Sequence, residues 1–350
     1  MSSTDYLKAR LLQRILSMYY FAELTQVEIA QQLQLSTAKV NRLLRQARKR
    51  KMVEVLIKTP YQHLFNLEAQ LKQEFGIREI QVIPDLNSDF DLSPLGEAGA
   101  DFLLEHLQDG DVIAIGGGTT IHALVQALTP KRSYDVSVVP VVGGVQGQVT
   151  TDVNYLASEM AGRLGGKPYL LHSPAFMETA QHRDALVSMG PIKEILDLAR
   201  RANIAVLGIG SVIPGISRFV QFTALSAHEM EQIAKRYGGV GEVLAVVYNI
   251  QGQPCAKPYE QRVVGLTLQE LERIPFRIGI AGTAGKATPL YGALRGKFFD
   301  ALITDESAAS GAMAVSRRIA ERPDVQAMSG KLTDEFARDP AGAVDDKGRE

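Results

Sequence analysis

The first fifty residues place apolar side chains at the spacing of helices. Between residues 12 and 20 apolar positions recur every three or four residues, which predicts a helix with one buried face. Thr25 followed by Glu28 has the form of a capping box and predicts the start of a second helix. After a short polar break a third helical pattern begins, which Ser36 or Thr37 can cap. Short helices joined by a sharp turn are therefore expected here.

The third helical pattern separates apolar from polar positions. Val40, Leu43, Leu44 and Ala47 follow the spacing i, i+3, i+4, i+7 and are expected to face inward. The opposite face carries side chains that can bond base edges or phosphates. The candidate DNA-binding residues, including the cap, are Ser36, Thr37, Lys39, Asn41, Arg42 and Arg45. A buried stripe beneath a polar, cationic face is typical of the reading helix of a helix-turn-helix.

Charge is distributed unevenly along the chain. Residues 1–58 contain eleven Lys and Arg against four Asp and Glu, a net charge of +7, whereas the whole chain carries −1. This asymmetry indicates that only the first segment meets a polyanion such as DNA. Residues 52–60 are expected to form a β-rich wing behind the basic helix. The alternative is a small helical bundle whose basic face contacts another protein.

Strands and helices alternate through the rest of the chain. A helix over 61–75, ended by Gly76, is expected to connect the basic segment to the remainder and to help two copies dimerise. Nearly continuous apolar strands between helices are typical of a mostly parallel sheet covered on both faces. The expected strands are 79–84, 111–118, 137–144, 167–171, 202–210, 241–249, 275–282 and 298–304.

These patterns predict an α/β fold with four regions. We expect a winged helix-turn-helix domain at 1–59 and a connecting helix at 60–76. An effector and oligomerisation domain, Rossmann-like and mostly parallel, is expected at 77–332. Residues 333–350 are polar and aperiodic, which is typical of a disordered tail.

Glycines gather at the predicted carboxyl ends of four strands. They are Gly116 to Gly118, Gly143 with Gly144, Gly208 with Gly210, and Gly282 with Gly285. Ligands of open α/β sheets bind at that edge. A glycine also ends strands that bind nothing, but four clusters at one edge of one sheet favour a ligand site.

Known nucleotide motifs do not fit these glycines. In the first cluster Ile121 stands where the dinucleotide fingerprint needs its third glycine. At 282–288 a Walker loop would need glycine where Ile280 stands, and Ser or Thr where Ala287 stands. Neither NAD nor ATP is therefore expected, and no cofactor is predicted.

The first cluster suits a small anion instead. Backbone amides at 116–120 and the hydroxyls of Thr119 and Thr120 can surround a phosphate at a helix start. Lys286, at another strand-to-helix junction, can supply the counter-charge. The alternatives are helix capping by the threonines and a lysine that is simply solvated.

Composition excludes several other classes of protein. The single cysteine, Cys255, forms no intrachain disulfide, and the six histidines lack the spacing of metal ligands, so no metal is expected. No apolar run approaches the length of a membrane span, and the N-terminus lacks a signal peptide, which predicts a cytoplasmic protein without a membrane partner. No nucleophile elbow is present. Asp305 and Glu306 can act as acid and base, but adjacent acids also commonly cap a helix.

These motifs, in this order, resemble the SorC-type sugar-responsive transcriptional regulators of bacteria. The resemblance rests on LTQVEIAQQLQLSTAKVNRLL, IGGGTT, VLGIG, GGVGEVLAVVYNIQG and FRIGIAGTAGKATPLYGALRGKFFDALITDE, and it covers about residues 12–330. It implies an effector domain folded like sugar-phosphate isomerases, a phosphorylated sugar as inducer, and a dimer or tetramer on operator DNA. It also implies that Thr119, Thr120 and Lys286 contact the phosphate.

The resemblance further implies a sugar pocket around Gly143, Gly144, Gln146, Gln148 and Arg218. Two departures lie where the sugar hydroxyls are expected to bind. Many relatives have Gly-Asp at Gly241-Glu242, and an aromatic pair ending in Asp at 247–249. The identity of the sugar therefore stays open. The expected effector-binding residues are Gly117, Gly118, Thr119, Thr120, Gly144, Gln146, Gln148, Arg218, Glu242, Lys286 and Asp305.

We therefore expect a DNA-binding regulator of a carbohydrate-utilisation operon, and not an enzyme. Its expected partners are operator DNA, a sugar or sugar phosphate, and further copies of itself. The alternative is a sugar-phosphate isomerase or deaminase with an appended basic head. A pure interaction scaffold fits poorly with the glycine-rich edge.

Overall fold

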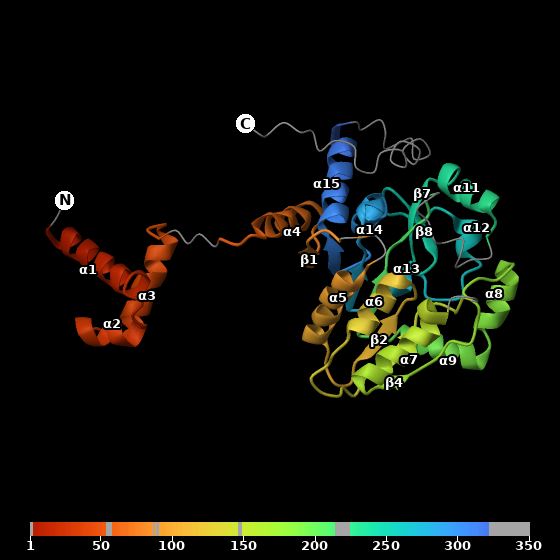
Figure 1. Ribbon diagram of the computed structural model, residues 1–350, viewed down its shortest axis with the longest axis horizontal. Coiled ribbons are helices and arrows are strands. Elements are labelled where there is room, and N and C mark those ends of the chain that lie inside the picture. Colours follow the sequence, from red (N-terminus) through yellow and green to blue (C-terminus); the bar gives the residue numbers. More distant parts are fainter. Residues whose placement is uncertain are drawn as a thin grey trace. The chain divides into compact units, whose positions relative to one another are not determined.

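The computed structural model describes residues 3–53, 58–86, 88, 91–145, 149–213 and 225–321. The chain divides into two compact units, Met1–Pro60 and Tyr61–Glu350 (Figure 1). Residues 54–57 of the predicted wing at 52–60, and all of the predicted tail at 333–350, are outside the described residues. Each unit is described by itself.

The first unit contains three helices around a small core. They are α1 (Ser3–Tyr20), α2 (Gln26–Leu33) and α3 (Thr37–Lys49). The predicted capping box is confirmed, because Thr25 and Glu28 bond each other's backbone amides. Gln34 ends α2 with φ 53°, and the turn to α3 follows at once. Ile15, Ile29 and Val40 are fully buried between the helices.

The second unit is built on a parallel sheet of seven strands. The order is β1-β10-β9-β5-β2-β3-β4, and every neighbouring pair is parallel, which confirms the predicted sheet. The strands are β1 (Glu79–Ile83), β2 (Val112–Ile115), β3 (Ser137–Pro140), β4 (Lys167–Pro168), β5 (Ile204–Gly208), β9 (Phe276–Ile280) and β10 (Ala301–Asp305).

Helices cover both faces of this sheet (Figure 1). On one face Ile113 and Ile115 pack against α5 (Ser93–His106), α6 (Thr119–Ala127) and α7 (Val153–Leu164). On the other face Ala114 belongs to a core with helices α4 (Gln62–Phe75), α9 (Gly190–Ala199), α13 (Leu268–Leu271), α14 (Ala287–Arg295) and α15 (Glu306–Glu321). Successive strand residues point to opposite faces, so a continuous apolar strand supplies both cores.

The predicted connecting helix is α4, and it packs into this unit. Leu64, Leu71 and Phe75 are buried in the core beside β1 and α15. The Glu68 carboxylate accepts a hydrogen bond of 2.8 Å from the Val82 amide, which ties α4 to β1. Gly76 ends the helix with φ 69°, as its position predicted.

A small antiparallel sheet corrects one sequence prediction. Residues 241–249 were expected to form one strand, but they form a hairpin of β7 (Gly239–Val243) and β8 (Val246–Asn249), which pairs with β6 (Gly210–Ser211). The turn is made by Leu244 and Ala245, with φ 58° and 61°. Glycine or asparagine normally occupies such positions, so the sequence carried no turn signal.

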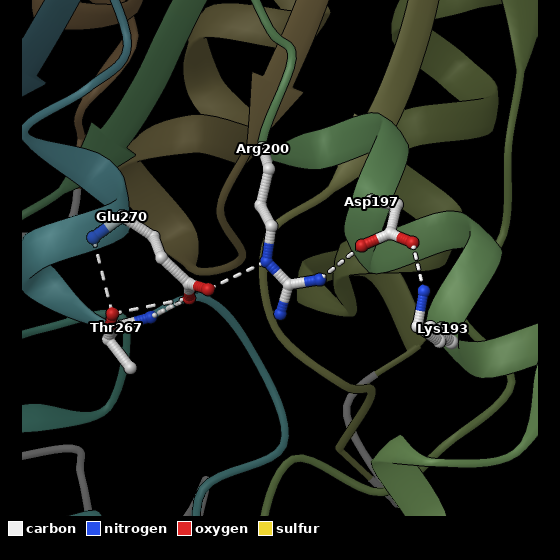
Figure 2. A network of polar contacts seen from close by, with 5 residues as sticks. All are labelled: Lys193, Asp197, Arg200, Thr267 and Glu270. Atoms are coloured by element: carbon white, nitrogen blue, oxygen red, sulfur yellow. Dashed lines mark hydrogen bonds and ion pairs between the residues drawn. The ribbon is translucent and has the colours of Figure 1, made fainter.

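The other helices that the structure describes are α8 (Ala180–Val187) beside α9, and α11 (Ala227–Lys235) and α12 (Lys257–Glu260) beside the small sheet. Two 3₁₀ turns are η1 (Val149–Thr151), which contacts α6 and α7, and η2 (Ala284–Lys286), which follows β9. A chain of polar contacts joins α9 to α13 (Figure 2): Arg200 bonds Asp197 and Glu270 at 2.6 Å each, and Asp197 bonds Lys193 at 2.8 Å.

Candidate functional site

The predicted reading helix presents its polar face to solvent. Val40, Leu44 and Ala47 are buried, with at most 3% of each exposed, so the helix has a fixed inward stripe. Ser36 is the N-cap, and its hydroxyl accepts a hydrogen bond of 3.2 Å from the Lys39 amide. The six candidate DNA-binding residues are all exposed: Ser36, Thr37, Lys39, Asn41, Arg42 and Arg45. The structure therefore confirms that this face is exposed, while its contact with DNA stays a prediction.

One cation of α3 has a structural role that the sequence did not reveal. The Arg48 guanidinium donates a hydrogen bond of 2.9 Å to the Tyr20 hydroxyl, and this bond raises the pKa of Arg48. Tyr20 in turn packs edge-on against Tyr19. Arg48 therefore holds the end of α3 to the end of α1, at a separation of 28 residues that no local pattern reports.

The four glycine clusters of the second unit meet at one edge of the sheet. They follow β2, β3, β5 and β9, which are consecutive in the order β9-β5-β2-β3. After β2 the chain adds β3 and β4 on one side of β2, and it then adds β5 on the opposite side of β2. The strand order therefore reverses between β2 and β5, and ligands of such sheets bind outside the carboxyl ends at this point.

The start of α6 stands at that reversal, directly after β2 and its three glycines. Gly118 is the N-cap, with φ 108° and ψ 171°, and no side chain caps the helix. The first helical bond runs from the His122 amide to the Gly118 carbonyl. The amides of Thr119, Thr120 and Ile121 have no backbone partner among the described residues.

The threonine hydroxyls of this turn are not used for capping. Thr119 and Thr120 are half-buried, and neither side chain bonds any residue that the structure describes. A Cβ at position 117 would lie 3.1 Å from the Thr151 carbonyl oxygen, so Gly117 lets η1 approach the turn closely. Amides and hydroxyls that lack partners in the described fold are a typical anion cradle.

Lys286 reaches the same part of the edge from β9. It ends η2, and its ammonium donates a hydrogen bond of 2.9 Å to the Ile209 carbonyl, just beyond β5. Because β5 pairs with β2, this contact brings the cation to the strand next to the glycine turn. Lys286 is therefore not the solvated lysine of the alternative interpretation.

Glu242 lies on β7 of the small sheet, and its carboxylate interacts electrostatically with the Lys286 ammonium. It pairs with Gly210, and a side chain at position 210 would occupy the place of the Glu242 carboxylate. Burial raises the pKa of Glu242, while the hydrogen bond of 3.0 Å from the Ala245 amide and the nearby Lys286 ammonium lower it, so that the net shift is upward. The carboxylate supports the strained turn of the hairpin.

Asp305 is buried at the end of β10, with 1% of the residue exposed. Its oxygens accept hydrogen bonds from the amides of Thr283 at 2.9 Å and Ala308 at 3.1 Å, and from the Ser307 hydroxyl at 3.1 Å. Burial raises its pKa, and these three bonds lower it less. The bond to Ala308 is the helix-capping role that the sequence left open.

The loop that follows β3 is fixed by residues that sequence analysis missed. The Gly144 amide donates to the Ser173 carbonyl at 2.8 Å. Asp152 caps α7 and also accepts a hydrogen bond of 2.9 Å from the Val145 amide. An Asp before an apolar helix is a cap signal that would have found it. The predicted pocket residues Gln146, Gln148 and Arg218 lie outside the described residues.

A groove elsewhere on this unit does not compete as the candidate site. Its lining includes residues of α8, α9, α12 and α13, and one of its cations, Arg200, already pairs with Asp197 and Glu270. In the described part of the chain no three His, Cys, Asp or Glu side chains are grouped to hold a metal ion. No helix among the described residues is long and apolar enough to cross a membrane.

Comparison with known proteins supports both units. A sequence model of the family described as "Putative sugar-binding domain" matches residues 59–314, and a model of sigma-70 region 4 matches residues 11–50. The sorbitol operon regulator of Klebsiella pneumoniae is 29% identical over 86% of this chain and 96% of its own length. The deoxyribonucleoside regulator of Bacillus subtilis is 27% identical over 83% of this chain and 93% of its own length.

A solved structure extends the comparison to the fold. The full-length sorbitol operon regulator SorC of Klebsiella pneumoniae superimposes with a TM-score of 0.67 at 28% identity, over 86% of this chain and 97% of that chain. These relatives are named regulators and not enzymes, so the acid-and-base alternative is set aside. The chain belongs to the sugar-binding-domain family, as a DNA-binding transcriptional regulator of the SorC type.

Proposed function

We propose that this regulator controls an operon for carbohydrate use and senses a phosphorylated sugar at the glycine edge. The observation that carries the proposal is the start of α6, where three amides and two threonine hydroxyls lack partners among the described residues. The descriptions of three relatives name deoxyribonucleosides, a sorbitol operon and erythritol catabolism, which supports a carbohydrate effector.

A phosphate fits this edge better than a neutral sugar alone. Amides at a helix N-terminus carry partial positive charge and favour an anion. Lys286, which follows β9, supplies a full positive charge at the end of β5, where its ammonium bonds the Ile209 carbonyl. The proposed phosphate contacts are Gly117, Gly118, Thr119, Thr120 and Lys286, and the proposed contacts of the sugar hydroxyls are Gly144 and Glu242. No cofactor or metal is required for this role.

Operator binding is assigned to the exposed face of α3. Lys39, Arg42 and Arg45 are exposed cations on one helix above a buried stripe. Such a helix enters the major groove, where arginine bonds guanine and asparagine bonds adenine. We expect a homodimer or homotetramer on a pseudo-palindromic operator, and hence action in the cytoplasm, where operator DNA lies.

Ligand control requires two states of the assembly. A sugar phosphate changes operator affinity only if it binds the two quaternary states with different affinity. The proposal therefore predicts that operator DNA and ligand alter each other's affinity reciprocally.

The test is fluorescence anisotropy on duplex DNA taken from upstream of the gene and its neighbours. It is run at one salt concentration with a panel of free and phosphorylated sugars. Specific binding that one phosphorylated sugar changes is the expected result. Binding no tighter than to random duplex, with every sugar, would overturn the operator assignment and call for a turnover assay with sugar phosphates.

A further inference from the structure

Thr283 adopts a backbone conformation that normally belongs to glycine. It opens η2 with φ 78° and ψ 150°. A β-branched residue is strained in this region, whereas glycine adopts it freely. The strained residue lies three positions before Lys286, in the turn that carries the proposed phosphate contact. A turn of this kind persists only where its surroundings hold it.

Asp305 is the group that holds the turn. Strands β9 and β10 are parallel neighbours, with Ile280 opposite Ile303, so the residues that follow β9 lie beside the end of β10. There the Thr283 amide donates to Asp305 Oδ2 at 2.9 Å. Bonds to Ser307 and Ala308 fix the same carboxylate to the first turn of α15. The position of the Asp305 carboxylate is therefore set by α15 and not by the loop that contains Thr283.

Thr283 in turn fixes the position of Lys286. Its carbonyl accepts a hydrogen bond of 2.9 Å from the Lys286 amide, and the Lys286 ammonium then bonds the Ile209 carbonyl. A continuous series of bonds therefore runs from the buried carboxylate, through the strained residue, to the cation at the ligand edge. Asp305 itself is 1% exposed and its known bonds all lie within the fold.

We propose that Asp305 is a positioning residue, which fixes Lys286 for the ligand anion through Thr283 and does not touch the ligand. This assignment rests on the proposed anion site and changes the role that the sequence predicted for Asp305. If this assignment is right, loss of the Asp305 carboxylate weakens ligand binding only while residue 283 is strained. If Asp305 contacted the ligand directly, its loss would weaken binding equally with threonine or glycine at position 283.

The experiment measures binding of inorganic phosphate and of ribose 5-phosphate to the full-length protein by calorimetry. Asp305→Asn is expected to weaken binding roughly tenfold, because asparagine has one acceptor oxygen for the amides of Thr283 and Ala308, and its NH2 group then faces one of these donors and releases the Thr283 turn. Thr283→Gly alone should leave binding close to that of the wild type. In the double variant glycine adopts the turn without strain, so affinity should return to within about threefold of the wild type.

Matched variants separate the possible failures. Ala284→Gly, whose backbone φ is not positive, should not rescue Asp305→Asn. An equal loss with threonine or glycine at 283 would overturn the positioning role. If Lys286→Ala leaves phosphate binding unchanged, the proposed anion site is wrong, and this outcome is distinct from failure of the positioning role of Asp305. Should Asp305→Asn not fold, the double variant must recover folding, and a double variant as unfolded as the single one overturns the proposal.

Discussion

The two units of the chain use their cations in opposite ways. In α1 to α3 no Lys or Arg forms an ion pair with a residue that the structure describes. In the α/β unit Arg200, Arg262 and Arg277 join separate elements through carboxylates. Figure 2 shows Arg200 held between Asp197 of α9 and Glu270 of α13.

This difference follows from what each unit must bind. Cations that already have protein partners gain little from a phosphate, because the existing pair must first be broken. Unpaired cations on an exposed helix release counterions from DNA at no such cost. Lys286 is an intermediate case, since its ammonium bonds a backbone carbonyl at the proposed ligand edge.

The largest effect is expected at Arg42, on the exposed face of α3. Arg42→Ala should weaken binding to the specific operator by between about tenfold and a hundredfold, as for loss of a base contact. Because Arg42 is exposed and forms no ion pair with a described residue, the melting temperature should stay that of the wild type. Anisotropy and thermal unfolding measure the two outcomes.

Arg10→Ala is the matched control for this prediction. Arg10 is also an exposed cation of the first unit, but it lies on α1. Its loss should weaken specific and random DNA alike, and only slightly, as a phosphate contact does. If Arg10→Ala costs as much specificity as Arg42→Ala, α3 is not the reading helix.

The next effect concerns Lys286 and separates the two units. Lys286→Ala should weaken the response to a phosphorylated sugar by about tenfold, because a charge-assisted hydrogen bond to the phosphate is lost. Operator affinity without ligand should not change. Lys257→Ala, which removes an exposed cation of α12, serves as control. An unaltered ligand response in Lys286→Ala would contradict the anion site.

Local signals made the first unit and the sheet predictable. The capping box at Thr25 and Glu28 lies within four residues, and apolar strands between helices indicate a parallel sheet. The order of the strands was not predictable, because β1 pairs with β10 from the other end of the chain. The hairpin turn at Leu244 and Ala245 was missed, since its strain is offset by Glu242 and by burial rather than by a turn residue.

The candidate site was predictable only in part. Glycine clusters identify strand ends, so the edge that contains Gly118 and Lys286 followed from the sequence. The contacts that fix the residues of this edge could not be predicted from the sequence. Asp305 reaches Thr283 across 22 residues, and Lys286 reaches Ile209 across 77. Contacts at such separations depend on strand order, which the hydrophobic pattern does not encode.

A smaller effect is expected at Arg200, where a paired cation stabilises the fold. Its side chain is 35% exposed and bonds Asp197 and Glu270, so solvent screens part of the interaction. Arg200→Ala should lower the free energy of unfolding by about 1 kcal/mol, measured by urea unfolding, and leave DNA binding unchanged. Arg201→Ala, which removes an exposed neighbour, should change stability by less than about 0.5 kcal/mol. Equal losses would mean that the pairing contributes nothing.

The smallest effect is the pH dependence of the same network. Burial raises the pKa of Glu270, but the Thr267 amide and the Arg200 guanidinium lower it more, so the net shift is downward. A carboxyl with a lowered folded pKa stabilises the protein above its unfolded pKa, about 4.3, and loses that contribution as the pH falls through the folded value. The wild type should therefore be more stable than Glu270→Gln by about 0.5 kcal/mol at pH 7. Urea unfolding should show this difference closing between about pH 5 and pH 3. If the difference in free energy of unfolding stays constant over this range, the charge of Glu270 does not stabilise the fold. The ion pairs of the α/β unit would then not distinguish it from the first unit energetically.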